Sequence, residues 1–361
     1  MREIDLKLAQ THYDSEWLDL AVHFRLLSLA VLANRDVVLD DLNDPLFDRL
    51  CGDRTSTCAE RVVLYETLAY GDAGVLLSCP GPSLSGIVMR ELGSQAQSEI
   101  FFSYVKSRKV RTFMAVTEPS KGSDAGNIET HIDADGRLFG EKWLVGNGRD
   151  GEIGTVIVRT GPGPYGIGIV MLTPEHLSSP AVTRTLLPVA GMRGAGLSLL
   201  RFDGLEVGQD WLLGQNKRPL ERGMLAVIKT FYRMRPCVAA LAIGTAQAAL
   251  DAAVTHSAAQ SKATEAIHVS LQAQLNAARR LNQKAARLID AGTMDGSAVS
   301  LAKAAATGIA ERIGAALTGL FGVKAFATDA WLQTLYADIH GYEWMEGSSD
   351  IQRFNIAQAL T

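Results

Sequence analysis

The segment 344–353 places one carboxylate, that of Glu346, among apolar and small residues directly before an expected helix. Desolvation by Trp344 and Met345 would raise the pKa of this carboxyl, whereas the N-terminal amides of the helix would lower it. A carboxylate balanced in this way is ready to accept a proton near neutral pH. Glu346 is therefore our candidate general base, although a surface glutamate before a last helix would give the same letters.

The residues after Glu346 predict the helix itself. Ser349 with Gln352 three positions later is the pattern of a capping box, so we expect Glu346 on the turn that leads in and not on the helix. An apolar stripe at helical spacing follows, formed by Ile351, Phe354, Ala357 and Leu360.

Length and charge limit the class of protein. The chain has 361 residues, of which 47% are hydrophobic, enough for sizeable cores and for roughly two or three domains. A net charge of -4 and a sequence pI near 6.0 argue against broad nucleic-acid binding and a membrane-surface role. No uncharged run reaches transmembrane length and the first residues lack an apolar core, so we expect no membrane partner and no targeting segment.

The cysteines indicate the compartment. They are few for so long a chain, and they lack the paired close spacing of a zinc site; they are Cys51, Cys58, Cys79 and Cys237. We therefore expect a reduced, cytoplasmic protein with no metal site.

Three blocks of different composition follow one another. Apolar residues at helical spacing mark 1–111, period-two segments rich in Thr, Val, Ile, Gly and Pro mark 112–212, and alanine-rich helical segments mark 213–361. In the last block we expect helices over 224–232, after Pro236, over 266–289 and over 297–320. The prediction is an α+β protein with an N-terminal helical domain, a middle β-domain and a C-terminal helical bundle.

The middle block contains clear turn signals. Asp135-Gly136 predicts a hairpin, and the Gly-Pro-Gly-Pro sequence at 161–164 separates two candidate strands. No helix of useful length interrupts the strands, so we expect an antiparallel sandwich or barrel and not a Rossmann unit.

A strand also runs into hydroxyl and glycine residues at 113–126. Gly122 permits close backbone approach, and Thr117 and Ser123 offer hydroxyl groups. The exposed amides of such a turn can hold a phosphate or the polar edge of a flavin, although a plain loop closing the β-domain would also fit.

Four features, in family order, resemble the acyl-CoA dehydrogenase family of flavoproteins over nearly the whole chain. They are 117–124, which resembles the flavin-contacting loop; 140–148 with 191–194 and 202–207, which resemble later parts of the β-domain; Arg235, which looks like the arginine opening a long family helix; and 346–353, which resembles the segment that carries the base. Order and spacing together are hard to obtain by accident.

The resemblance implies a middle antiparallel β-domain, a C-terminal four-helix bundle and bound FAD. Glu346 would remove the proton α to a thioester carbonyl, and the β-hydrogen would leave as hydride to flavin N5. Arg235 and Gly347 would contact the substrate. The residues implied to lie against FAD are Val116, Thr117, Gly122, Ser123, Leu144, Gly146, Ser348 and Asp350.

Partners follow from the same resemblance. They are an acyl thioester on coenzyme A or on a carrier protein, an electron-accepting flavoprotein or other acceptor, and further copies of the chain in a dimer or tetramer. A basic cluster formed by Lys217, Arg218, Arg222, Arg233 and Arg235 could receive an acidic carrier protein, the phosphates of coenzyme A, or only solvent.

Some positions depart from the family pattern. Leu144 and Gly146 stand where members have an aromatic residue and a Thr or Ser, and Gln260 lies where members have a residue for the FAD of a neighbouring subunit. Two alternatives therefore stay open. One is oxidation of a hydroxyacyl thioester or monooxygenation on the same fold, and the other is a non-catalytic paralogue that serves as a complex partner.

Overall fold

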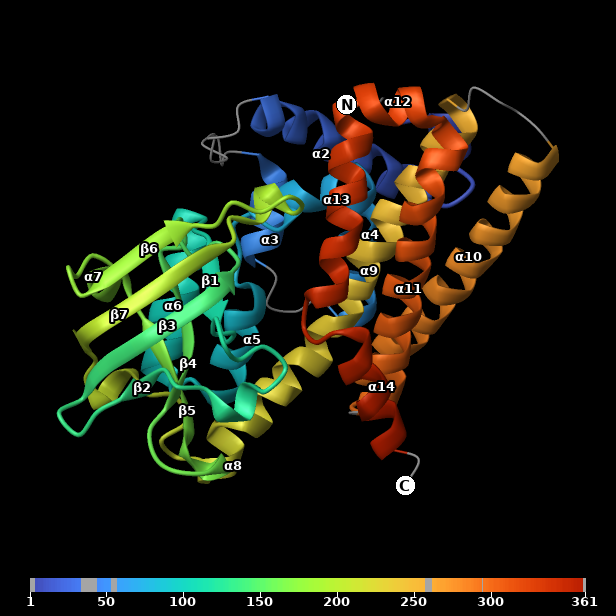
Figure 1. Cartoon of the computed structure of the whole chain (residues 1–361). Helices are drawn as coiled ribbons and strands as arrows, with labels where there is room; N and C mark the ends of the chain where they lie inside the picture. The colour runs from blue at the N-terminus through green and yellow to red at the C-terminus, as the bar shows by residue number, and fades with distance from the viewer. Residues whose placement is uncertain (1–3, 34–43, 53–56, 257–261, 294, 360–361) are drawn as a thin grey trace.

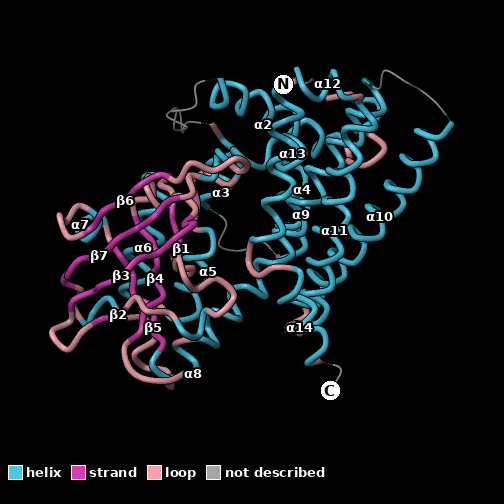
Figure 2. Tube along the Cα trace, in the orientation of Figure 1, coloured by secondary structure: helices cyan, strands magenta, loops and turns pink. Residues whose placement is uncertain are grey.

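The computed structural model describes residues 4–33, 44–52, 57–256, 262–293 and 295–359. A β-domain lies to one side of a long helical body that contains both the first and the last helices of the chain (Figures 1 and 2). The expected order of helical, β and helical segments is confirmed.

Local capping signals start some of the first helices, among them α4 (Cys58–Leu76). In α4, the side chain of Thr57 accepts a hydrogen bond from the Glu60 amide, and the Glu60 carboxylate accepts one from the Thr57 amide. The same helix is kinked at Asp72, where the backbone leaves helical geometry. Over its described residues this part forms the helices α1 (Leu6–Ala9), α2 (Ser15–Ala33), α3 (Pro45–Gly52), α4 (Cys58–Leu76), α5 (Ser83–Leu92) and α6 (Gln95–Arg108).

The β-domain is one seven-stranded sheet with the order β1-β4-β2-β3-β7-β6, and β5 pairs with β4. A short helix, α7 (Pro174–Leu177), interrupts it. The strands are β1 (Thr112–Ala115), β2 (His131–Ile132), β3 (Arg137–Val145), β4 (Ile153–Arg159), β5 (Ile167–Leu172), β6 (Val182–Leu186) and β7 (Ser198–Glu206).

The turn predictions are confirmed, but the expectation of purely antiparallel pairing was wrong in detail. Gly136, at a φ of 78°, closes the β2–β3 hairpin, and the 161–164 turn joins the antiparallel pair β4 and β5. However, β1 and β2 both run parallel to β4. The chain between β1 and β4 passes through β2 and β3, which supplies the crossover that a parallel pair needs.

The C-terminal helices form a bundle that also takes in α4. Its members are α8 (Pro219–Arg222), α9 (Met224–His256), α10 (Lys262–Asp290), α11 (Gly296–Phe321), α12 (Val323–Thr328), α13 (Ala330–Trp344) and α14 (Ser349–Gln358). Contrary to expectation, α9 does not break at Pro236. The residues that follow, 237–250, are all buried, so packing holds this helix together despite the hydrogen bond that proline cannot make.

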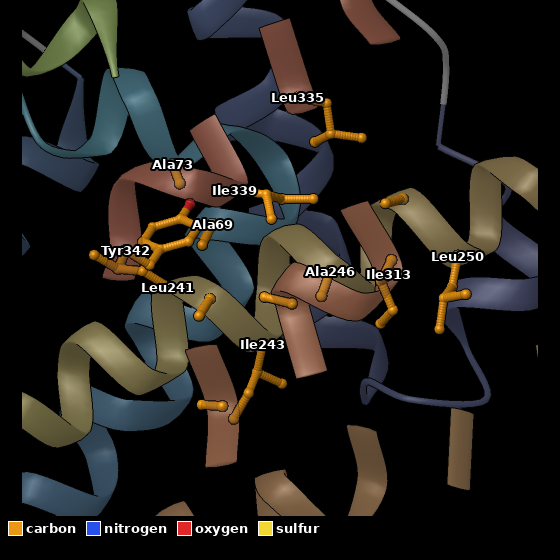
Figure 3. Close-up of a cluster of buried hydrophobic side chains, with 14 of the residues drawn as sticks. Ala69, Ala73, Leu241, Ile243, Ala246, Leu250, Ile313, Leu335, Ile339 and Tyr342 are labelled. Carbon is orange, nitrogen blue, oxygen red and sulfur yellow. The ribbon is translucent and has the colours of Figure 1, made fainter. Parts of the chain in front are cut away.

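The largest core lies where α4, α9, α11 and α13 meet (Figure 3). Small side chains allow the close approach, since a Cβ added at Gly244 of α9 would lie 2.2 Å from the Glu66 carbonyl oxygen of α4. Among the described residues, α9 is long and apolar enough to cross a membrane by length and composition. However, 89% of its most hydrophobic window is buried inside the protein, as in a core helix.

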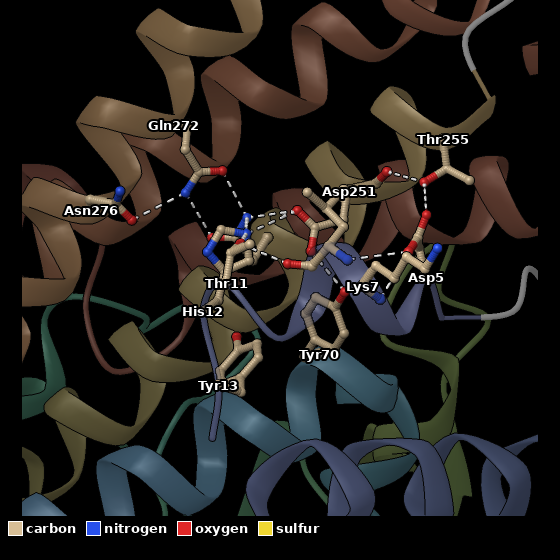
Figure 4. Close-up of polar contacts among 12 residues, drawn as sticks. Asp5, Lys7, Thr11, His12, Tyr13, Tyr70, Asp251, Thr255, Gln272 and Asn276 are labelled. Carbon is tan, nitrogen blue, oxygen red and sulfur yellow. Dashed lines mark hydrogen bonds and ion pairs between the residues drawn. The ribbon is translucent and has the colours of Figure 1, made fainter. Parts of the chain in front are cut away.

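Polar groups tie the N-terminal residues to the bundle (Figure 4). The Tyr70 hydroxyl donates to Asp251, and Thr255 donates to Asp5. Next to this network, Glu66 of α4 accepts hydrogen bonds from Tyr13 at 3.2 Å and from Nε of Arg279 at 2.7 Å. Because Glu66 and Arg279 are both largely shielded from solvent, neither charge has water as an alternative partner.

We predict that Glu66→Gln lowers the free energy of unfolding by about 3 kcal/mol or more, because it leaves the Arg279 guanidinium buried without its counterion. Chemical denaturation at neutral pH measures this change. The matched control is Glu265→Gln on exposed α10 surface, which should change stability by less than about 0.5 kcal/mol. A Glu66→Gln protein as stable as the control would contradict the prediction.

Candidate active site

Glu346 lies on the turn between α13 and α14, as predicted. Its φ of 52° and that of Gly347, 96°, place two successive residues in the left-handed region. For a residue with a side chain this conformation costs about 1–2 kcal/mol, so the surrounding structure must hold the turn.

Three buried side chains from three helices hold it by its carbonyl oxygens. Nε of Arg235 in α9 donates to the Glu346 carbonyl at 3.0 Å. Nζ of Lys303 in α11 donates to the carbonyls of Glu343 at 2.9 Å and of Gly347 at 2.7 Å. Nε2 of Gln352 in α14 adds a bond to Gly347 at 2.9 Å.

The predicted capping box at Ser349 and Gln352 was wrong. The N-cap residue of α14 is Ser348, which makes no side-chain cap bond, and the side chain of Gln352 turns to the loop carbonyls instead. The Glu343 carboxylate caps α14 instead. It accepts a hydrogen bond from the amide of Ser349 at 2.6 Å and one from its hydroxyl at 2.7 Å. A charged acceptor at a helix N-terminus is stronger than a neutral serine cap.

Glu346 is partly buried as a residue, and its Oε2 atom is shielded from water. Burial raises its pKa to about 8, while the positive charges of Arg235 and Lys303 act in the opposite direction. Its Oε2 is buried and makes no hydrogen bond within the described part of the chain. This group can therefore exchange a proton with a ligand that reaches it.

The expected sources of the pKa shift were wrong. Trp344 is 73% exposed, so it cannot desolvate Glu346, although Met345 does pack against the main core. The opposing effect, which lowers the pKa of Glu346, comes from the charges of Arg235 and Lys303. It does not come from the amides of α14, and the amide of Ser349 already donates to the Glu343 carboxylate.

The apolar stripe of α14 does not face the core of this chain. Phe354 is 58% exposed and Ala357 is exposed, whereas the fully buried residue of α14 is the polar Gln352. Leu360 lies outside the described residues. A sequence pattern shows that one face is apolar, but it does not show what covers that face.

On the β-domain side, the loop after β1 is fastened to β3. Lys142 forms a buried ion pair with Glu118 at 3.0 Å and also donates to the Val116 carbonyl at 2.9 Å. The amide of Trp143 donates to the Thr117 carbonyl at 2.8 Å. The structure thus brings Val116 and Thr117 beside the end of β3, close to Leu144.

The other expected β-domain residues border open space. Gly122 and Ser123 are exposed, and a Cβ added at Gly122 would meet nothing within 4 Å. A Cβ at Gly146 would meet only the Ala195 carbonyl, at 3.8 Å. Leu144 sits at a bulge of β3 with a φ of 55° and is 36% exposed.

The candidate residues therefore form two groups. Arg235, Glu346 and Gly347 lie together on the bundle, with Ser348 and Asp350 on the adjoining start of α14. The loop after β1 is on the side of the β-domain nearer the bundle (Figure 1). Gln260 lies outside the described residues.

Sequence reasoning missed two residues that shape the turn. One is Glu343, whose carboxylate caps the start of α14. Lys303 was counted as part of an alanine-rich helix. The available signal was a single charge within the apolar run 301–306.

Comparison with known proteins finds two family matches in this chain. The family description "Acyl-CoA dehydrogenase, middle domain" matches residues 113–205, and "Acyl-CoA dehydrogenase, C-terminal domain" matches residues 221–361. The chain is 28% identical over 305 residues to 3-(aryl)acrylate reductase of Clostridium sporogenes, which covers 81% of this chain and 79% of that protein.

Solved structures share the fold. Butyryl-CoA dehydrogenase from Megasphaera elsdenii matches with a TM-score of 0.83 and 24% identity over 100% of both chains. The prolyl acyl carrier protein oxidase AnaB matches with a TM-score of 0.78 and 18% identity, over 96% of this chain and 99% of that one. Since the two family descriptions together match more than half of the chain, it belongs to the acyl-CoA dehydrogenase family of oxidoreductases.

Proposed function

We propose that this protein is an FAD-dependent acyl-thioester dehydrogenase in which Glu346 removes the proton α to the thioester carbonyl. The observation that carries the proposal is the buried carboxyl of Glu346, with a raised pKa and an unpartnered Oε2, on a turn fixed by buried side chains. A carboxylate with a pKa of about 8 is a stronger base than an ordinary glutamate and is better matched to an acyl α-proton.

The β-domain side fits a flavin. The loop after β1 is held firmly at Val116 and Thr117, while Gly122 and Gly146 leave room that side chains would fill. When bound, FAD would accept the hydride from the β-carbon, since no side chain here can do so. The residues proposed to hold it are Val116, Thr117, Gly122, Ser123, Leu144 and Gly146 from the β-domain and Ser348 and Asp350 from the start of α14.

The turn would also bind the substrate carbonyl. Loss of the α-proton builds negative charge on that oxygen, so fixed donors there stabilise the transition state more than the substrate. We assign this role to the backbone amide of Glu346. Arg235 fixes the Glu346 carbonyl and, with Gly347, keeps the turn in the orientation that this requires.

The first test of the proposal uses Glu346→Gln. This variant should fold and take up FAD as the wild type does, yet flavin reduction by a competent acyl thioester should slow by about 10² to 10⁴, because the amide cannot accept the proton. Anaerobic bleaching of the flavin measures the rate, and a thermal shift with excess FAD measures cofactor binding.

Two results would contradict the proposal. Wild-type bleaching by Glu346→Gln would place the base elsewhere. A colourless wild-type protein that neither takes up FAD nor gains thermal stability from it would favour the non-catalytic paralogue, which the missing hydroxyl at Gly146 motivates. Glu343→Gln is the companion variant, and its expected effect is lower stability because it removes the cap of α14.

The proposed assembly is a homo-oligomer, a dimer or tetramer, that covers the apolar face of α14. Phe354 is 58% exposed on this helix, and Leu301 of the neighbouring α11 is 46% exposed. Light scattering at micromolar concentration should show the oligomer for the wild type and a smaller species for Phe354→Glu, which places a charge in the interface. A flavin-bound wild-type monomer would rule out this assembly.

We propose that a carrier protein presents the acyl substrate to this enzyme. The basic cluster keeps an excess of positive charge, because its cations outnumber the two carboxylates, of Glu91 and Glu221, that pair with them. Arg235 was wrongly placed in this cluster, since it is buried against the Glu346 turn. Without Arg235 the cluster consists of Lys217, Arg218, Arg222 and Arg233, which are all at least partly exposed, and Lys229 adds a cation that shares Glu91 with Arg233.

The same acyl group presented on a carrier protein and on coenzyme A, at two salt concentrations, tests this partner. Carrier proteins are acidic, so carrier-driven flavin reduction should be the faster of the two at low salt and should fall as screening increases. A double substitution of Lys217 and Arg222 to Gln should reduce that salt dependence. Equal or faster turnover of the coenzyme A thioester would exclude carrier preference.

A further inference from the structure

Lys303 is a buried lysine in the N-terminal third of α11 that no catalytic or binding role yet explains. Its side chain is 0% exposed, and its neighbours in sequence, Leu301, Ala302 and Ala304, are apolar. Within the described residues no carboxylate lies within ion-pair distance of its Nζ. An ammonium in such a place is costly unless fixed acceptors replace water.

The acceptors it has are the two carbonyls that flank Glu346. Nζ lies 2.9 Å from the Glu343 carbonyl and 2.7 Å from the Gly347 carbonyl, so one ammonium bridges the end of α13 and the left-handed turn. The Glu346 residue lies between these two anchor points. Arg235 approaches the same turn from α9, through the carbonyl of Glu346 itself.

We propose that Lys303 is the positioning residue for Glu346: it locks the turn that presents the carboxylate, and its positive charge keeps that carboxylate available as a base. The inference rests on the proposed role of Glu346. It assigns Lys303 an electrostatic function in addition to that of a structural tie between two carbonyls.

The charges around the turn support an electrostatic role. Burial raises the pKa of Glu346 to about 8 and lowers that of Lys303 to about 8, and each group opposes the shift of the other. The other groups facing this pair are Arg235 and the Cys237 thiol of α9 and Glu343 of α13. Removing the Lys303 charge would therefore raise the pKa of Glu346 further.

The pH profile of flavin reduction tests the proposal. The wild-type rate should rise with pH through about 8, as Glu346 loses its proton. Lys303→Met and Lys303→Gln, both neutral, should move this rise upward by about one pH unit, which lowers the rate at pH 7 about tenfold. Lys303→Arg carries a charge that does not titrate in this range, so the rise should stay at or below its wild-type pH. The control Lys284→Met, on exposed α10 surface, should behave as wild type.

A second readout does not depend on turnover. Because the folded-state pKa of Glu346 lies above its ordinary value of 4.5, the folded protein keeps a proton that the unfolded chain loses. Glu346 therefore lowers stability progressively as pH rises from about 4.5 to about 8, and Glu346→Gln removes this loss. The stability gained by Glu346→Gln should level off near pH 8 with Lys303 and at higher pH with Lys303→Met or Lys303→Gln.

The outcomes distinguish an electrostatic role of Lys303 from a purely structural one. A lower maximal rate or lower stability in the neutral variants, with both midpoints unmoved, would show that Lys303 is only a structural tie and would overturn the proposal. Lys303→Gln retains one donor for the carbonyls, so it serves if Lys303→Met does not fold. If Glu346→Gln reacts at the wild-type rate, the base assignment fails, yet the stability measurement still decides the coupling between Lys303 and Glu346.

Discussion

The site depends on two buried cations that face a carboxylate without bonding to it. The Nε of Arg235 and the Nζ of Lys303 give their hydrogen bonds to backbone carbonyls, so Oε2 of Glu346 stays unpartnered. A direct bidentate ion pair would occupy the carboxylate oxygens and lower the pKa well below the neutral range. Without any cation, ionising the buried carboxyl would cost too much. The arrangement lies between these limits, and in the role that we propose for Glu346 it leaves the carboxylate both basic and free to meet a substrate.

This arrangement requires helices that come close together and a β-domain fixed against them. The loop between β6 and β7 provides the second requirement, because a Cβ at Gly191 would lie 2.2 Å from the Ala337 carbonyl and one at Gly194 would lie 2.4 Å from the Gly74 carbonyl. The amide of Met192 donates to the Asp338 carboxylate at 2.5 Å. Ala337 and Asp338 lie on α13, the helix that ends at the Glu346 turn, so one helix locates both groups of site residues.

The sequence was informative where the signal is local and poor where it is tertiary. The Asp135-Gly136 hairpin, the helical character of the first and last blocks and the place of Glu346 on a turn follow from neighbouring residues, and all are confirmed. The order of motifs along the chain correctly predicted the family. The cap of α14 could not be predicted, because its acceptor, Glu343, belongs to the preceding helix and depends on the path of the turn.

Contacts between residues that lie far apart in the sequence were harder to predict. Lys303 meets its acceptors 40 or more residues later in the chain, and nothing in an alanine-rich helix shows which face its one lysine occupies. The continuity of α9 through Pro236 was missed for a related reason. Local propensity favours a break there, but burial of the following residues outweighs it.

The absence of a hydroxyl at Gly146 is a property of the site and not a demand of the fold. The backbone there does not have the positive φ that would require glycine, and an added Cβ would stand in ordinary contact with one carbonyl, at 3.8 Å. Positive φ occurs instead on either side of Gly146, at Leu144 with 55° in the bulge of β3 and at Asn147 with 56°. Strain at a bulge re-aims a side chain, and here the re-aimed side chain is apolar and partly exposed. Leu144 and Gly146 therefore contribute shape and apolar surface, and in the chemistry that we propose the titratable group is Glu346, on the bundle side.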